Sequence, residues 1–155
     1  MACVTLDDKP HFVLGMVGFG LLDANGEEIK LKSREATAKK IVVSRSHAGK
    51  VEELVKKAFN QETYTVESAG GSGYKALRLI NGTAEIYIHT TAIKGWDTCA
   101  GDAIIHAAGG SLIDLQGQPF SYSSNGDTLH KNGLLMALRN PFSTLARIKQ
   151  YLPKQ

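Results

Sequence analysis

Short runs of β-branched residues alternate with helical patterns from residue 41 onward, and this alternation limits the chain to few architectures. The run 41–44 has the composition of a strand, and apolar residues then recur at helical spacing, which predicts a helix over 46–59. Two more strands and two more helices follow: strands over 63–66 and 84–90, and helices that open at 70–73 and at Asp97. The alternation predicts an α/β fold, a layered sandwich with a largely parallel sheet.

The end of the chain adds two strands and a helix with clear boundary signals. Gly109-Gly110 ends the helix that opens at Asp97, as glycines commonly do. The runs 111–115 and 133–138 read as strands. Asn140-Pro141 then predicts the start of a last helix, because asparagine is a good N-cap and proline is favoured at the first helical position.

Residues 1–32 have a different pattern from the rest of the chain. The predicted elements are strands over 2–6 and 12–17, turns at 7–10 and 23–27, and a polar linker over 33–40. We therefore expect two parts. Residues 1–38 form a β-hairpin segment with its linker, and residues 39–155 form a C-terminal α/β domain.

Composition excludes several classes of function. The chain has 155 residues, 43% of them hydrophobic, which is enough for a normal core. Its net charge of +3 is modest and its lysines are spread out, so we expect no nucleic-acid partner. No apolar run approaches the ~20 residues of a membrane span, so we expect no membrane segment.

Three segments that could carry chemistry fall at the ends of predicted strands, where α/β sheets usually bind ligands. The first is 44–47, Ser-Arg-Ser-His, whose hydroxyls and helix-start amides suit an anion such as phosphate. The second is the glycine-rich turn 70–75, where the backbone can approach a ligand and Lys75 adds positive charge. The third is Trp96-Asp97, a carboxylate at a helix start that can hold a divalent cation.

Each segment also has a purely structural interpretation. Ser46 can simply cap a helix, a glycine-rich turn is structural more often than not, and an aspartate at a helix start is usually a cap. The glycines do not have the spacing of a P-loop. The other histidines are scattered, and we interpret them as structural or surface residues: His11, His89, His106 and His130.

Taken together and in this order, the three segments resemble the inositol monophosphatase superfamily. The resemblance covers roughly residues 40–140 and rests on Ile-Val-Val-Ser-Arg-Ser-His at 41–47, Ala-Gly-Gly-Ser-Gly-Tyr-Lys at 69–75, and Trp-Asp-Thr-Cys-Ala-Gly at 96–101 with its trailing Gly109-Gly110. The first two blocks make the chain most similar to the 3′-phosphoadenosine 5′-phosphate phosphatases, in particular the Golgi-resident branch.

The resemblance implies the C-terminal half of the sugar-phosphatase fold and Mg²⁺-assisted hydrolysis of a phosphate monoester, 3′-phosphoadenosine 5′-phosphate to AMP and phosphate. It implies that Asp97 is a metal ligand, that Ser44 and His47 contact the substrate, and that Gly71 and Lys75 line the same pocket. The small-molecule partner would be an adenosine bisphosphate or an inositol phosphate, and the compartment would be the Golgi lumen.

The sequence departs from the family in its acidic residues. The family's other metal ligands lie on a Gly-Glu-Glu block and an Asp-Pro-Leu-Asp-Gly/Ala-Thr block, and this sequence has neither as a metal-binding block. Gly26-Glu27-Glu28 stands where the family has a later, variable hairpin, so we interpret that match as accidental. We therefore expect a truncated form with one metal ligand and no catalytic base, inactive alone, since a general acid or base contributes ~10²–10⁴-fold in rate.

A second hypothesis is a non-catalytic module derived from the same fold. Such a module would bind a nucleotide in the retained pocket, or a protein at an exposed sheet edge. Apolar surface that the missing half would cover also favours self-association of the chain. Calorimetric titration with adenosine bisphosphates separates the hypotheses, because affinity without turnover favours the binding module.

Overall fold

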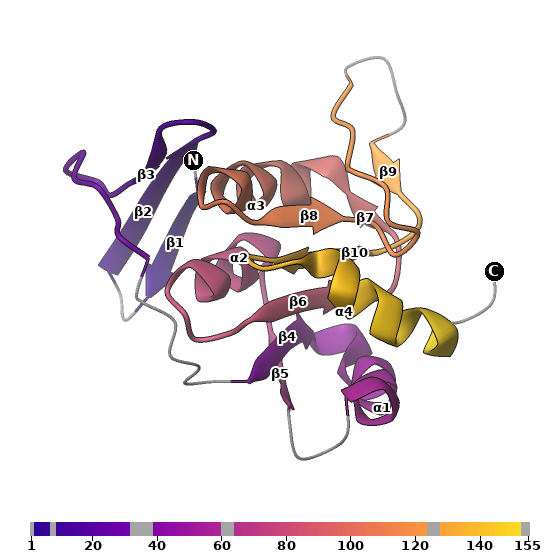
Figure 1. Ribbon diagram of the computed structural model, residues 1–155. Helices are drawn as coiled ribbons and strands as arrows, with labels where there is room; N and C mark the ends of the chain where they lie inside the picture. Colours follow the sequence, from indigo (N-terminus) through magenta and orange to yellow (C-terminus); the bar gives the residue numbers. More distant parts are fainter. Residues whose placement is uncertain (1, 7–8, 32–38, 60–63, 124–127, 153–155) are drawn as a thin grey trace.

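The computed structural model describes residues 2–6, 9–31, 39–59, 64–123 and 128–152, and for residues 2–6, 9–10 and 47 it describes the backbone alone (Figure 1). The strands are β1 (Ala2–Leu6), β2 (Lys9–Met16), β3 (Gly20–Leu22), β4 (Lys40–Ser44), β5 (Thr65–Ala69), β6 (Ile86–His89), β7 (Ile93–Lys94), β8 (Ser111–Ile113), β9 (Leu129–His130) and β10 (Leu134–Ala137). The helices are η1 (Arg45–His47), α1 (Ala48–Phe59), α2 (Ser72–Ile80), α3 (Gly95–Ala107), α4 (Pro141–Ile148) and η2 (Lys149–Tyr151).

A five-stranded sheet lies at the centre of the α/β domain, in the order β5-β4-β6-β10-β8. Strand β4 is parallel to both β5 and β6, whereas β10 is antiparallel to β6 and β8. All the strands except β10 therefore run in one direction. The predicted α/β sandwich with a largely parallel sheet is confirmed.

Two pairs of helices cover the two faces of this sheet. Helices α2 and α3 pack on one face, where alternate strand residues such as Val42, Tyr87 and Met136 are buried. Helices α1 and α4 pack on the other face, against residues of the opposite parity such as Val43 and Leu135. The inner strands β4, β6 and β10 are thus buried on both faces, which explains why they read as apolar runs.

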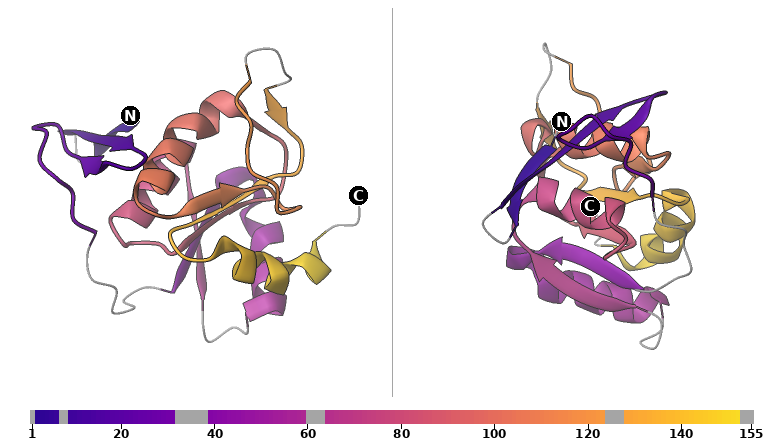
Figure 2. Two further views of the ribbon diagram at one scale, coloured as in Figure 1. Left: turned by 45° about the horizontal axis from the view of Figure 1, so that its top comes forward. Right: turned by 90° about the vertical axis from the view of Figure 1, so that its left-hand side faces the viewer.

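The second sheet, in the order β1-β2-β3, packs on the side of α3 that faces away from the central sheet (Figures 1 and 2). The approach is close: a Cβ atom added at Gly15 of β2 would lie 2.9 Å from the Cα atom of Ile104, so this position requires glycine. Val13 and Leu21 are the buried anchors of this sheet. The described layers therefore alternate as sheet, helices, sheet, helices.

The opposite face of the small sheet is apolar and exposed. Because side chains alternate along a strand, burial of Val13 leaves its neighbours in β2 on the outer face. Exposed apolar side chains on this sheet and its turn are Phe12, Leu14, Met16, Val17, Phe19 and Leu22. We call these six residues the outer apolar face. Among the described helices, none is both long and apolar enough to cross a membrane.

Several predicted boundaries are confirmed. Gly109 has a φ angle of +77° just after the C-terminal end of α3, a conformation that favours glycine. Asn140 caps α4, because its side-chain Oδ1 accepts a hydrogen bond from the amide of Ser143, and Pro141 is the first helical residue. In the turn at 23–27, the carboxylate of Asp23 accepts bonds from the amides of Asn25 and Glu27.

Other predicted boundaries are wrong. The helix predicted over 46–59 starts differently, because a 3₁₀ turn, η1, precedes α1, and Ser44 occupies the N-cap position of that turn. Asp97 is not a cap either, since α3 begins at Gly95 and Lys94 occupies its N-cap position. Lys9 and Pro10 belong to β2 and not to a turn. The short strands β3, β7 and β9 were not predicted, and the predicted linker falls mostly outside the described residues.

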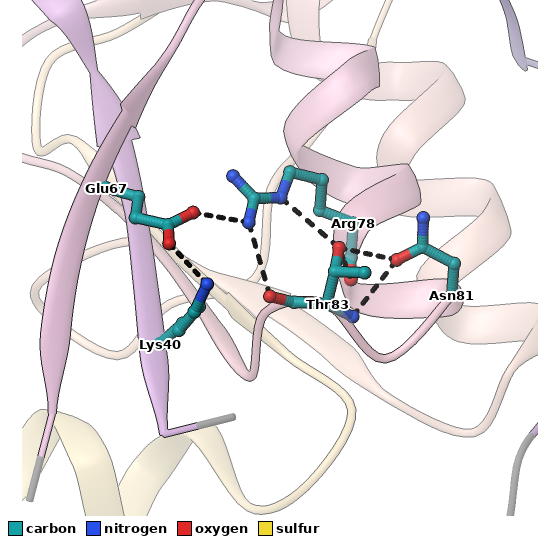
Figure 3. Close-up of polar contacts among 5 residues, drawn as sticks. All are labelled: Lys40, Glu67, Arg78, Asn81 and Thr83. Atoms are coloured by element: carbon teal, nitrogen blue, oxygen red, sulfur yellow. Dashed lines mark hydrogen bonds and ion pairs between the residues drawn. The ribbon is translucent and has the colours of Figure 1, made fainter. Parts of the chain in front are cut away.

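A polar network ties α2 to strands β4 and β5 (Figure 3). Glu67 pairs with Lys40 at 2.5 Å and with the Arg78 guanidinium at 2.6 Å. Arg78 also donates to Thr83, whose hydroxyl in turn donates to Asn81. This network holds the C-terminal end of α2 against the sheet. The N-terminal end of α2 lies at the other end of the helix, near the carboxyl ends of β4 and β6.

Candidate functional site

A pocket of about 460 Å³ opens where β4 and β6 end and where α2 and α3 begin. This is the edge at which α/β sheets bind ligands. Its lining residues are Ser44, Gly71, Ser72, Lys75, Tyr87, His89, Ala92, Ile93, Lys94, Asp97 and Leu129. Four of the five residues assigned from the sequence are in this set, although they lie up to 53 positions apart in the chain.

Lys75 provides a buried positive charge in this pocket. Its side chain lies on the first turns of α2, is only 3% exposed, and donates from Nζ to the carbonyl oxygens of Gly71 and Ala69. The ammonium also lies 4.8 Å from the ring centre of Tyr87, a cation–π contact. A lysine ammonium has three N–H donors, so one remains for a ligand after these two bonds.

Burial lowers the pKa of Lys75 to about 8, because the charged form loses its hydration there. The carboxylate of Asp97 opposes this shift, and the guanidinium of Arg45 adds to it. An anionic ligand in the pocket would stabilise the charged form. The site is therefore unfavourable for a bare ammonium and suited to an ammonium paired with an anion.

The first turn of α2 adds backbone donors beside Lys75. Gly71 is the N-cap residue with a φ angle of +71°, and no side chain caps this turn in the described structure. Amides at the start of a helix point toward the pocket edge and attract anions. The hydroxyl of Ser72 lies 3.5 Å from that of Tyr87, so the hydroxyls of both elements face the same space.

Asp97 lies in the first turn of α3 and is exposed to solvent at the pocket mouth. It is the one carboxylate among the described residues that line the pocket. No group of three or more histidine, cysteine, aspartate or glutamate residues in the described part of the chain could hold a metal ion. Mg²⁺ normally takes more than one charged oxygen together with waters and substrate, so the described residues alone do not form a magnesium site.

A hydrogen-bonded chain of side chains forms the wall of the pocket on the side of β4 and β6. The Ser44 hydroxyl lies 2.9 Å from Nδ1 of His89, and Nε2 of His89 lies 3.0 Å from the hydroxyl of Thr91. His89 is 8% exposed. Burial raises the pKa of the neighbouring Tyr87 phenol, whose hydroxyl contacts that of Ser72, so the phenol remains neutral.

The structure brings four of the residues predicted from the sequence around one pocket: Ser44, Gly71, Lys75 and Asp97. The fifth residue, His47, is the last residue of η1, and its side chain lies outside the described part of the structure.

Seven lining residues were not predicted as site residues from the sequence: Ser72, Tyr87, His89, Ala92, Ile93, Lys94 and Leu129. Ser72 stands inside the glycine-rich turn that was identified, whereas His89 was interpreted as structural and Tyr87 as part of a strand. Their two-residue spacing at the end of a predicted strand was an available signal, because alternate residues share a face.

Comparison with known proteins identifies the family. The model of the inositol monophosphatase family matches residues 14–146. "Inositol monophosphatase 3" of Danio rerio is 40% identical over 161 residues, which cover 95% of this chain and 46% of the relative. "Golgi-resident adenosine 3′,5′-bisphosphate 3′-phosphatase" of Rattus norvegicus is 37% identical over 163 residues, 95% of this chain and 44% of the relative.

A solved structure supports the same fold. The crystal structure of 2′AMP-bound SaIMPase-II has a TM-score of 0.68 at 17% identity, over 96% of this chain and 60% of that one. The chain spans about half the length of the curated relatives that it matches. Because the family model matches most of its residues, this chain belongs to the inositol monophosphatase family.

Proposed function

We propose that this chain forms the substrate-binding side of a phosphate-monoester hydrolase whose substrate is 3′-phosphoadenosine 5′-phosphate, released as AMP and phosphate. The family and its phosphatase relatives support the reaction class. The names of the mammalian relatives support an adenosine bisphosphate as the substrate.

The observation that carries the proposal is the buried Lys75 ammonium beside the uncapped start of α2. A buried cation needs an anionic partner, and phosphate oxygens suit both the ammonium and the helix-start amides. Gly71 allows a ligand to approach the backbone because its position carries no side chain. We assign the substrate phosphate to this corner of the pocket.

The remaining assigned residues complete the proposed binding site. Ser44 supplies a hydroxyl from the end of β4, and the backbone of His47 places that residue on the turn that follows. Asp97 lies across the pocket mouth, and we propose it as one ligand of Mg²⁺. When bound, Mg²⁺ would neutralise phosphate charge and activate water.

Slow turnover by the isolated chain is part of the proposal. Asp97 is a lone carboxylate in the described pocket, and the ammonium of Lys75 competes with a cation for its charge. The described pocket also holds no second carboxylate that could act as a general base. We therefore expect binding of the substrate without efficient hydrolysis.

Calorimetry and a phosphate-release assay test this function on the purified 155-residue chain. We expect 3′-phosphoadenosine 5′-phosphate to bind in buffer with EDTA, and Lys75→Met to abolish the heat of binding. Lys50→Met, on the exposed face of α1, is the matched control and should bind as the parent does. Absence of binding would refute the proposed site, and rapid Mg²⁺-dependent phosphate release would refute the predicted inactivity.

A non-catalytic interaction module is the second candidate, and the outer apolar face favours it. The side chains of Phe19 and Met16 are 83% and 61% exposed, which is unusual for residues of this size. We propose that copies of the chain associate through this face. Sedimentation velocity should show dimers that dissociate in the variant Met16→Glu/Phe19→Glu, and a monomeric parent would exclude self-association.

The compartment is also a proposal. The rat and mouse relatives are named as Golgi-resident, which supports a Golgi location for this chain. Fluorescence of the tagged protein in cells, compared with a Golgi marker, tests it.

A further inference from the structure

Two hydrogen bonds of His89 determine whether the Ser44 hydroxyl in the pocket wall donates or accepts. Nε2 of His89 lies 3.4 Å from the backbone carbonyl oxygen of Ala92, in addition to its contact with the Thr91 hydroxyl. A carbonyl oxygen can only accept, so with one proton on the His89 ring this contact places that proton on Nε2. Nδ1 is then a bare lone pair, and the Ser44 hydroxyl donates to it across 2.9 Å.

This assignment fixes the role of the Ser44 hydroxyl. Its single hydrogen is directed to Nδ1 of His89. The oxygen of Ser44 is thereby left to accept a hydrogen bond from a ligand. Acceptors match the hydroxyl groups of a sugar, whereas the oxygens of a phosphate need donors such as Lys75.

We propose that His89 is a positioning residue that makes Ser44 an acceptor for a sugar hydroxyl next to the bound phosphate, so that the pocket prefers a ribonucleotide to its deoxy analogue. The inference rests on the proposed function of this pocket. The two sides of the pocket then bind different groups. The α2 side binds the phosphate of the ligand, and the β4–β6 side accepts a hydrogen bond from its sugar hydroxyl.

Burial and hydrogen bonds hold the His89 ring in one orientation. His89 is almost fully buried, both of its ring nitrogens are within 3.0 Å of a hydroxyl, and it lies at the end of a central strand. The backbone around it is crowded as well, because a Cβ atom at Gly133 would lie 2.2 Å from the carbonyl oxygen of His89. A ring held this firmly can orient its neighbour with little cost in side-chain entropy.

Titration calorimetry with two ligands tests the inference: 3′-phosphoadenosine 5′-phosphate and its 2′-deoxy counterpart, each with the full chain in EDTA. The parent should bind the ribonucleotide about threefold to tenfold more tightly, the difference expected of one hydrogen bond. Ser44→Ala and His89→Phe should each remove this preference, and the double variant should lose nothing further. His89→Asn should restore part of it, because an amide oxygen near the position of Nδ1 can accept from Ser44.

The controls separate positioning from folding and from the proposed function. His11→Phe, on exposed β2, should keep the parent's preference, and circular dichroism should show that each variant is folded. If His89→Phe does not fold, Ser44→Ala and His89→Asn carry the comparison. Equal affinity of the parent for the two ligands, or an unchanged preference in Ser44→Ala, overturns the inference and leaves the proposed function standing. Binding of neither ligand overturns both.

Discussion

Binding of phosphate by this chain should depend on pH through Lys75. Burial lowers the pKa of this lysine to about 8, and its ammonium is the buried cation that we assign to the ligand phosphate. With that pKa, about nine tenths of the side chain is charged at pH 7 and about one tenth at pH 9. If only the charged form binds, the association constant should fall about tenfold between these pH values. A phosphate monoester does not interfere, since its second pKa is near 6.

Calorimetric titration of the chain with 3′-phosphoadenosine 5′-phosphate at half-unit steps from pH 6.5 to 9.5 measures this dependence. The variant Lys75→Arg keeps its charge throughout the range and should give a flat profile, although its affinity can differ. A flat profile for the parent, or the same decline in Lys75→Arg, would refute the assignment of the phosphate to Lys75.

Lys75 should also make the stability of the fold depend on pH, in the opposite direction: binding weakens as pH rises, whereas stability increases. The pKa of Lys75 is lower in the folded chain than its ordinary value of 10.5, so the unfolded chain binds this proton more tightly. The contribution of Lys75 to the free energy of unfolding should therefore rise as pH increases from about 8 to about 10.5. Urea denaturation of the parent and Lys75→Met at both ends of this range isolates that contribution.

Three further substitutions test the packing that positions the site, each by urea denaturation. Ile104→Ala should lower the free energy of unfolding by about 2–5 kcal/mol, because this fully buried side chain packs in the core around α3; a loss below ~1 kcal/mol would show that the helix is loosely packed. Gly133→Ala should be at least as severe, since a Cβ atom would lie 2.2 Å from the carbonyl oxygen of His89 at a φ angle of +66°, and a folded, stable variant would contradict this geometry. Glu67→Gln should cost only about 1 kcal/mol or less, because Glu67 is 36% exposed and solvent screens its two ion pairs (Figure 3); a loss above ~3 kcal/mol would mean that the network is more than a surface cluster.

Local signals explain which parts of the fold could be predicted from the sequence. The stop at Gly109 and the cap at Asn140 depend on the conformations of single residues, and both predictions are confirmed. The start of α3 depends on a distant contact instead: the amide of Gly95 donates to the carbonyl of Thr128 at 2.7 Å. The helix therefore begins two residues before Asp97, a shift that no local pattern indicates.

Long-range contacts also explain why some residues of the site were not predicted. His89 lies in the pocket because β4 and β6 are neighbours, with Val43 paired to Ile88, and this pairing joins segments 45 residues apart. The sequence shows that both segments are strands but not that they are adjacent. The antiparallel direction of β10 could not be predicted either, because a strand pattern reads the same in either direction.

The most direct test of the account is a crystal structure of the chain with 3′-phosphoadenosine 5′-phosphate bound. The account predicts a phosphate group within hydrogen-bonding distance of Nζ of Lys75 and of the first amides of α2, in the pocket that Ser44 and Asp97 also line. A ligand bound elsewhere on the chain, or a phosphate directed away from Lys75, would contradict it.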